Sequence, residues 1–262
     1  ADRRPKTSAQ LRTLIHQLHQ HNLMLFVGSN TPHDTLLPNN LSLARQLMSE
    51  INHEPNRHDS PEKLFTLYLN ESGLQRSQLI DRLMGYFQAQ PLPPLLAEIP
   101  AFGWSDLFTT NQHTYLEQAY ARQKRPFRVI ISTEDYRQRQ SGQTLLYKLH
   151  GALNERAHNL PIECLPLTEY DFEWRTIARL DWFWQQMQRK WQNGRSMLML
   201  FATEEEVMTI RRRYKPEESK GVIWIAGAAF SHEEQEIYRN LGLRILPESE
   251  LELLSTLKTF PL

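Results

Sequence analysis

Residues 105–117 read SDLFTTNQHTYLE, and this stretch predicts a strand, a polar turn and a helix in immediate succession. Leu107 and Phe108 supply the apolar strand, and the helix is expected to begin near Gln112. In α/β proteins, such a turn presents side chains to a ligand at the carboxyl end of a strand. The segment therefore indicates a parallel sheet with Asn111 at one strand end.

A second predicted strand also ends in a polar residue. The run Leu145–Leu149 (LLYKL) leads directly into His150 and Gly151. If the two strands share one parallel sheet, Asn111 and His150 face the same crevice. An uncharged amide would then meet a titratable imidazole, so these two residues are the candidate catalytic pair.

Together, the two segments resemble the SIR2-like family, the NAD-consuming relatives of sirtuin deacylases. The shared pattern is TTN-x-x-x-x-x-E at 109–117 followed by a strand-borne His150-Gly151. The order of the other landmarks is similar: a strand and turn at 23–30, a helical segment, and further strand–helix units after the two motifs. The resemblance covers residues 10–255. It implies that Asn111 and His150 flank the nicotinamide riboside of NAD, which is a substrate.

The rest of the chain fits an α/β fold. Further apolar runs of strand length occur at 23–27, 127–132, 197–201, 221–227 and 243–246. Their alternation with helical patterns favours a Rossmann-like, mostly parallel sheet with helices on both faces. Residues 41–89 show only helical periodicity and are followed by four prolines in 90–100, so we expect a small helical subdomain inserted at 41–100. We expect residues 1–262 to form a single SIR2-like domain.

The turn after the first strand is the candidate pyrophosphate site. In the family it resembles, a glycine-alanine-glycine turn brings backbone amides close to the phosphates. Here the turn is Gly28-Ser29-Asn30, and asparagine tolerates positive φ better than most residues. The resemblance thus implies that Gly28, Ser29 and Asn30 contact the cofactor. An ordinary β-turn without a ligand is the alternative.

The resemblance implies further NAD contacts from Thr110, Gly151 and Thr203. It also shows two more departures besides the altered glycine turn. Residues 201–203 read Phe-Ala-Thr where the family has a glycine-aromatic-serine turn against the adenosine ribose. His113 stands where relatives often carry an acid.

Two functions from different classes therefore stay open. In the first, the domain is an NAD+ nucleosidase that hydrolyses NAD to nicotinamide and ADP-ribose, as SIR2-like effectors of bacterial anti-phage defence do. Asn111 would orient a water or a ribose hydroxyl, and His150 would accept the proton of the nucleophile. In the second, the three departures make the site degenerate, and the domain is a scaffold or nucleotide-sensing module in a multi-protein assembly. We also expect a homo-oligomer or partner protein subunits.

Composition excludes several other classes. The 30 lysines and arginines balance the 30 acids, so we expect no direct nucleic-acid binding by the isolated domain. Cys164 is the only cysteine, which excludes the four-cysteine zinc module of sirtuin deacylases and fits a reducing cytoplasm. We expect no metal site. Apolar runs fall far short of the roughly 20 residues of a spanning helix, so we expect no membrane segment.

A long helix at 173–192 is predicted to carry an apolar stripe. The stripe consists of Trp174, Ile177, Leu180, Trp184, Met187 and Trp191. This spacing favours core packing, with a helix–helix subunit contact as the alternative. Glu134 and Asp135, which follow a predicted strand, could hold a ribose hydroxyl or, as an exposed loop pair, contact solvent.

Overall fold

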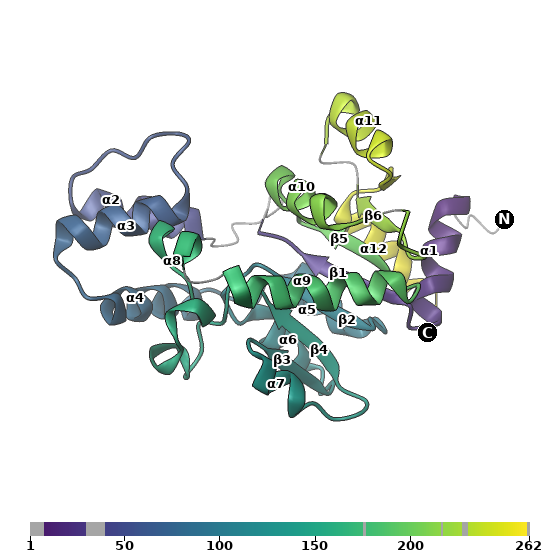
Figure 1. The fold of residues 1–262 in the computed structure, drawn as a ribbon, viewed down its shortest axis with the longest axis horizontal. Coiled ribbons are helices and arrows are strands. Elements are labelled where there is room, and N and C mark those ends of the chain that lie inside the picture. Colours follow the sequence, from purple (N-terminus) through teal and green to yellow (C-terminus); the bar gives the residue numbers. More distant parts are fainter. Residues whose placement is uncertain (1–7, 30–39, 175–176, 216, 227–229, 261–262) are drawn as a thin grey trace.

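The structure, a computed structural model, describes residues 8–29, 40–174, 177–215, 217–226 and 230–260. Its strands are β1 (Leu23–Val27), β2 (Asp106–Thr109), β3 (Phe127–Ile130), β4 (Thr144–Lys148), β5 (Ser196–Leu200), β6 (Ile223–Ala226) and β7 (Arg244–Leu246). They form one sheet in the order β3-β4-β2-β1-β5-β6-β7, and every pairing is parallel (Figure 1). The predicted α/β, Rossmann-like fold class is confirmed, with strand bounds within two residues of those expected.

The helices connect the strands and cover the sheet. They are α1 (Ala9–His19), α2 (Asn40–Glu50), α3 (Pro61–Ser72), α4 (Arg76–Gln88), α5 (Pro94–Glu98), α6 (Tyr115–Arg122), α7 (Thr133–Arg137), α8 (Glu169–Trp174), α9 (Ile177–Gln192), α10 (Glu204–Arg213), α11 (His232–Asn240) and α12 (Glu250–Lys258), with short 3-10 turns at Ile99–Ala101, Ala157–Asn159 and Ile162–Cys164. None of these helices, over the ranges that the structure describes, is long and apolar enough to cross a membrane.

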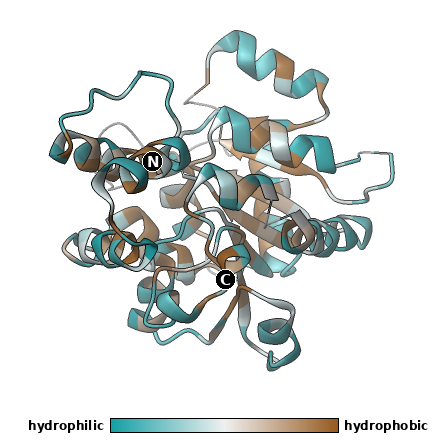
Figure 2. Ribbon diagram, turned by 60° about the vertical axis from the view of Figure 1, so that its left-hand side comes forward, coloured by the Kyte–Doolittle hydropathy of each residue, from teal (hydrophilic) through white to brown (hydrophobic). Residues whose placement is uncertain are grey.

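The central strand β1 supplies side chains to both faces of the sheet, and all five of its residues are buried. Leu23, Leu25 and Val27 join the cluster that contains the buried residues of α1, α5, α6 and α12. Met24 and Phe26 join the second cluster, with residues of α9, α10 and α11. Alternation of this kind is expected of a parallel strand covered on both sides. Figure 2 shows the hydrophobic colour concentrated on the strands and on the inward sides of the helices.

At one end of the molecule, α2, α3, α4 and α8 lie together away from the sheet (Figure 1). We call these four helices the helical lobe. Arg76 of α4 pairs with the buried carboxylate of Asp171 in α8, at 2.6 Å between Nη1 and Oδ2. The lobe is therefore built from two separate stretches of chain. Helix α5, which lies within the predicted insertion at 41–100, packs against α6 beside the sheet instead.

Helix α6 begins at Tyr115 rather than near Gln112. The carbonyls of the preceding residues are occupied by groups outside the helix. Lys148 Nζ donates to the carbonyls of His113 (2.5 Å) and Gln112 (3.3 Å), and the Leu153 amide donates to the Gln112 carbonyl (2.8 Å). Because these acceptors are used by distant residues, the first helical turn forms only after them.

The helix predicted at 173–192 is divided into α8 and α9, with 175–176 outside the described residues. Helix α8 starts at Glu169, earlier than expected, because Asp171 Oδ2 accepts the amides of Leu167 (2.8 Å) and Thr168 (3.0 Å). Of the predicted stripe, Trp184, Met187 and Trp191 are buried in the core. Core packing is therefore confirmed for those three, and the side chains of Trp174 and Ile177 lie outside the described residues.

Candidate functional site

Parallel pairing of β2 with β4 brings the two candidate catalytic residues to one edge of the sheet. Thr109 is the register partner of Lys148, and the Leu149 amide donates to the Thr109 carbonyl at 2.9 Å. Asn111 lies two residues after Thr109, and His150 lies two residues after Lys148. The sequence argument placed both at carboxyl ends of neighbouring strands, and that is where they lie.

Asn111 is bound to the end of β1. Its side-chain Nδ2 donates to the Gly28 carbonyl at 2.7 Å, and its backbone amide donates to Thr109 Oγ1 at 3.0 Å. Thr109 Oγ1 in turn donates to the Val27 carbonyl at 2.7 Å. This bond uses one of the two Nδ2 hydrogens and sets the orientation of the amide, so Oδ1 is the atom that could accept a hydrogen bond from a water or a hydroxyl group.

His150 is partly buried beneath the helical lobe. Phe172 of α8 lies edge-to-face with its ring, with centroids 4.9 Å apart and an interplanar angle of 82°. Burial of the ring, followed by the nearby charge of Arg179, lowers the pKa of His150 to about 4. Arg179, on α9, donates to the carbonyls of Ile131 (2.7 Å), Lys148 (2.7 Å) and Leu149. The imidazole is therefore neutral at pH 7 and able to accept a proton.

Ser29, Thr110 and Thr203, three of the other predicted binding residues, donate to a carboxylate that the sequence argument missed. Glu206 of α10 accepts the Ser29 amide on both oxygens (3.1 and 3.2 Å) and the Thr203 amide on Oε2 (2.8 Å). The Thr110 hydroxyl donates to Glu206 Oε1. The T-x-x-E spacing at 203–206 is a capping-box signal that sequence alone could have shown. The contacts from Ser29 and Thr110 are tertiary and carry no such local signal.

These donors lie at the point where the strand order reverses. The chain passes from β1 to β2 on one side and from β5 to β6 on the other, so the crevice between β1 and β5 is the switch point. The turn with Gly28 and Ser29 follows β1, and Thr203 follows β5. This is the usual location of a nucleotide in an open α/β sheet, and here it holds the Glu206 carboxylate. Asn30 lies outside the described residues.

Two glycines of the predicted site are required by the protein's own packing. A Cβ on Gly28 would lie 2.4 Å from the Phe201 carbonyl oxygen and 2.5 Å from Glu206 Oε2. Gly151 has φ +83°, and a Cβ there would lie 1.9 Å from the Cys164 carbonyl oxygen. At both positions, other parts of the same chain therefore lie too close to the glycine for a side chain to fit.

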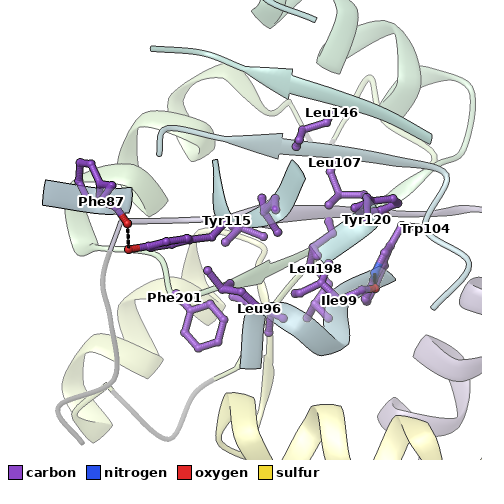
Figure 3. Close-up of a cluster of buried hydrophobic side chains, with 14 of the residues drawn as sticks. Phe87, Leu96, Ile99, Trp104, Leu107, Tyr115, Tyr120, Leu146, Leu198 and Phe201 are labelled. Carbon is purple, nitrogen blue, oxygen red and sulfur yellow. Dashed lines mark hydrogen bonds between the residues drawn. The ribbon is translucent and has the colours of Figure 1, made fainter. Parts of the chain in front are cut away.

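His113, which replaces an acid of the family pattern, is a core residue. Only 8% of it is exposed, and its ring lies 4.4 Å from that of Tyr115 and 5.4 Å from that of Phe87. Burial, followed by the charge of Lys148, lowers its pKa to about 3. Figure 3 shows Tyr115 and Phe87 within a cluster of buried hydrophobic side chains, where the Tyr115 hydroxyl donates to the Phe87 carbonyl. The ring therefore packs with aromatic side chains, as a neutral group.

A buried ion pair between Lys148 and Glu117 lies beside the Asn111 turn. Lys148 is fully buried in β4, and its Nζ lies 2.8 Å from Glu117 Oε1. Burial lowers the pKa of Lys148, and the Glu117 charge opposes that shift. The sequence contains a signal for this ion pair. Lys148 stands inside the otherwise apolar run at 145–149, and a buried charge requires a partner.

The remaining residues considered from the sequence are Asp135, at the start of α7, and Cys164, whose carbonyl faces Gly151. Asp135 is buried and accepts the Ile131 and Ser132 amides at the start of α7, so the expectation of an exposed loop residue is wrong for it. Burial raises the pKa of the Cys164 thiol, which is free. Across the described ranges, no group of three or more His, Cys, Asp or Glu side chains is placed to hold a metal ion.

A comparison with protein families matches residues 105–246 to a model described as SIR2-like domain. The match covers more than half of the chain and includes the Asn111 turn, the His150 turn and residues 201–203. A search of curated proteins finds no match. SIR2-like domains are generally NAD-dependent enzymes, which makes NAD the ligand to test. On the strength of this match and of the parallel sheet that carries both motifs, the chain belongs to the SIR2-like domain family.

Proposed function

We propose that this domain is an NAD+ nucleosidase, which hydrolyses NAD to nicotinamide and ADP-ribose. The observation that carries the proposal is the placement of Asn111 and His150 at the carboxyl ends of two neighbouring parallel strands. Asn111 also contacts the end of β1, one of the two strands that flank the switch point at which α/β proteins bind nucleotides. Membership of the SIR2-like family supports NAD as the substrate.

The two side chains suit the chemistry of glycosidic cleavage. The bond between nicotinamide and ribose C1′ breaks, its electron pair stays on the departing nitrogen, and positive charge develops on the ribose. Water then bonds to C1′ and loses a proton. Asn111 Oδ1 orients the water or a ribose hydroxyl, and the neutral His150 imidazole accepts the proton. Help of this acid–base kind is worth about 10²–10⁴-fold, and positioning of the ribose supplies much of the rest.

A second function is favoured by a specific contact. Glu206 occupies the Ser29 and Thr203 amides, which would otherwise be available to a phosphate group. If that carboxylate remains in place, the domain is a degenerate scaffold or a nucleotide-sensing module of a larger assembly. Tight NAD binding without turnover identifies a sensor, and no NAD binding identifies a scaffold.

The cellular setting belongs to the same proposal. We place the domain in the cytoplasm, in agreement with the free thiol of Cys164, as an effector of bacterial anti-phage defence. It acts there as a homo-oligomer or with partner protein subunits. This setting follows from the resemblance to defence effectors of the SIR2-like family.

The test is a nicotinamide-release assay on the protein in its native assembly, with the purified chain alone beside it. Nicotinamide and ADP-ribose should form in equal amounts from NAD. The assembly is the decisive sample, because an effector can be silent until its partners activate it. Absence of nicotinamide from the activated assembly would overturn the nucleosidase proposal.

A further inference from the structure

Gln112 lies between the two turns of the candidate site, and the proposed reaction does not use it. The residue follows Asn111 directly, and only 3% of it is exposed. Its Nε2 donates to the carbonyls of His150 (2.9 Å) and Pro166 (2.7 Å). Its Oε1 accepts from Asn40 Nδ2 at 2.9 Å. One side chain thus joins the His150 turn, the loop before α8 and the first residue of α2.

The orientation of this amide is determined by its neighbours. Both hydrogens of Nε2 point to carbonyl oxygens, and Oε1 faces the amino group of Asn40. A reversed amide would place its oxygen against two other oxygens. The polar end of Gln112 is therefore held in a single arrangement, and no apolar side chain can replace its donors.

The backbone of Gln112 is bound to the same region. Its carbonyl accepts the Leu153 amide at 2.8 Å and Lys148 Nζ at 3.3 Å. Lys148 precedes His150 in the chain and Leu153 follows it, so Gln112 contacts the His150 turn from both ends and at its centre. These contacts, together with its own bonds to Gly28 and Thr109, hold Asn111, one residue away.

We propose that Gln112 is a positioning residue, which sets the separation of Asn111 from His150 and connects both turns to the helical lobe through Asn40. The proposal rests on the proposed nucleosidase function for its kinetic consequences. Chemistry of this kind is sensitive to geometry, since a shift of about 1 Å in a reacting group can cost roughly 100-fold in rate.

Two substitutions separate positioning from simple stability. Gln112→Met keeps the length of the side chain and removes the amide, whereas Gln112→Asn keeps the amide and shortens it by one methylene. Gln118→Met is the matched control, because Gln118 is exposed on α6 and bonds only to Thr114. Each variant is assayed in the native assembly, well below its own melting temperature.

For Gln112→Met, kcat should fall by about 10- to 100-fold while the KM for NAD changes little. The kcat of Gln112→Asn should lie between that of Gln112→Met and that of the wild type. The Gln118→Met control should match the wild type. A lower melting temperature with unchanged kcat for Gln112→Met or Gln112→Asn would make Gln112 merely structural and overturn the proposal.

An NMR titration of histidine side chains tests the same residue without any turnover. The His150 signal is assigned by its absence from His150→Gln. In the wild type it should titrate near pH 4, and in a folded Gln112 variant it should titrate closer to the unperturbed value of about 6.5, because a loosened turn admits water. An unchanged His150 titration in a folded Gln112 variant would overturn the proposal. Absence of nicotinamide release from the wild type would instead defeat the nucleosidase function and leave this test in force.

Discussion

The two halves of the candidate site differ in what occupies them. On the β2–β4 side, a neutral amide and a neutral imidazole face the edge, supported by Gln112 and the buried Lys148–Glu117 pair. On the β1–β5 side, the backbone donors are already bound by the Glu206 carboxylate. The first half thus presents neutral polar groups, whereas the second half holds an anion of its own. The difference teaches that the two halves must be tested separately, because a substitution in one half leaves the contacts of the other unchanged.

The largest expected effect tests the β2–β4 side. Asn111→Ala and His150→Ala should each lower nicotinamide release by about 10²–10⁴-fold, the usual value of acid–base and orienting groups. Asn70→Ala and His19→Ala, at exposed positions on α3 and α1, are the matched controls and should retain full activity. A melting curve for each variant checks the fold. If either site variant unfolds, that residue is structural, and the β2–β4 side no longer has a proposed catalytic pair.

Next in size is the acid sensitivity that His113 confers. Its folded-state pKa of about 3 lies below the unfolded value of 6.5, so the unfolded chain binds the proton more tightly. The stability that the neutral ring provides is complete above pH 6.5 and is lost as the pH falls toward 3. Relative to pH 8, this single residue should cost about 2 kcal/mol of unfolding free energy at pH 5.

Urea denaturation at the two pH values, for the wild type and for His113→Phe, measures that cost. The variant should lose less stability between pH 8 and pH 5, since phenylalanine has no proton to bind. Equal losses in both proteins would show that other groups govern the acid response.

A smaller effect is expected on the β1–β5 side. Glu206→Ala removes a carboxylate from the Ser29 and Thr203 amides. ADP-ribose should then bind about tenfold more tightly, because its phosphates can accept hydrogen bonds from these amides at the amino end of α10. The same change removes a capping box and should cost about 1 kcal/mol of stability. Glu252→Ala, which removes the equivalent box from α12, is the control for stability alone. Unchanged ADP-ribose affinity in calorimetry would mean that Glu206 does not compete with the ligand.

The smallest effect expected is a near absence of change. Because the pKa of His150 lies near 4, its imidazole stays neutral at pH 5.5 and turnover should remain within about twofold of its value at pH 7.5. A pH–rate profile of the assembly measures this. A loss of activity with a midpoint near 6.5 would contradict the role of a buried, neutral His150.

Local patterns predicted the sheet well. The apolar run at Leu23–Val27 is β1 without any change of bounds, since a continuous apolar run followed by a turn is typical of a parallel strand that is buried on both faces. The positions of Asn111 and His150 followed from the same reasoning, because carboxyl ends of parallel strands meet at one edge. These features depend on residues that are near one another in sequence.

Contacts between distant residues could not be predicted in this way. The late start of α6 depends on Lys148 and Leu153, more than thirty residues away, which take the carbonyls of the first expected turn. The occupation of the Ser29 amide by Glu206 joins positions separated by 177 residues. His113 has a polar side chain, and only the three-dimensional structure shows its aromatic surroundings.

The construction of the helical lobe from two stretches of chain has a mechanical consequence. Phe172, which lies against the His150 ring, belongs to α8, and Arg76 ties that helix to α4 through Asp171. A displacement of α8 relative to the sheet would therefore move the Phe172 ring against the His150 imidazole, and the Arg76–Asp171 pair couples α8 to α4. The surroundings of the imidazole thus depend on a helix that is not part of the sheet.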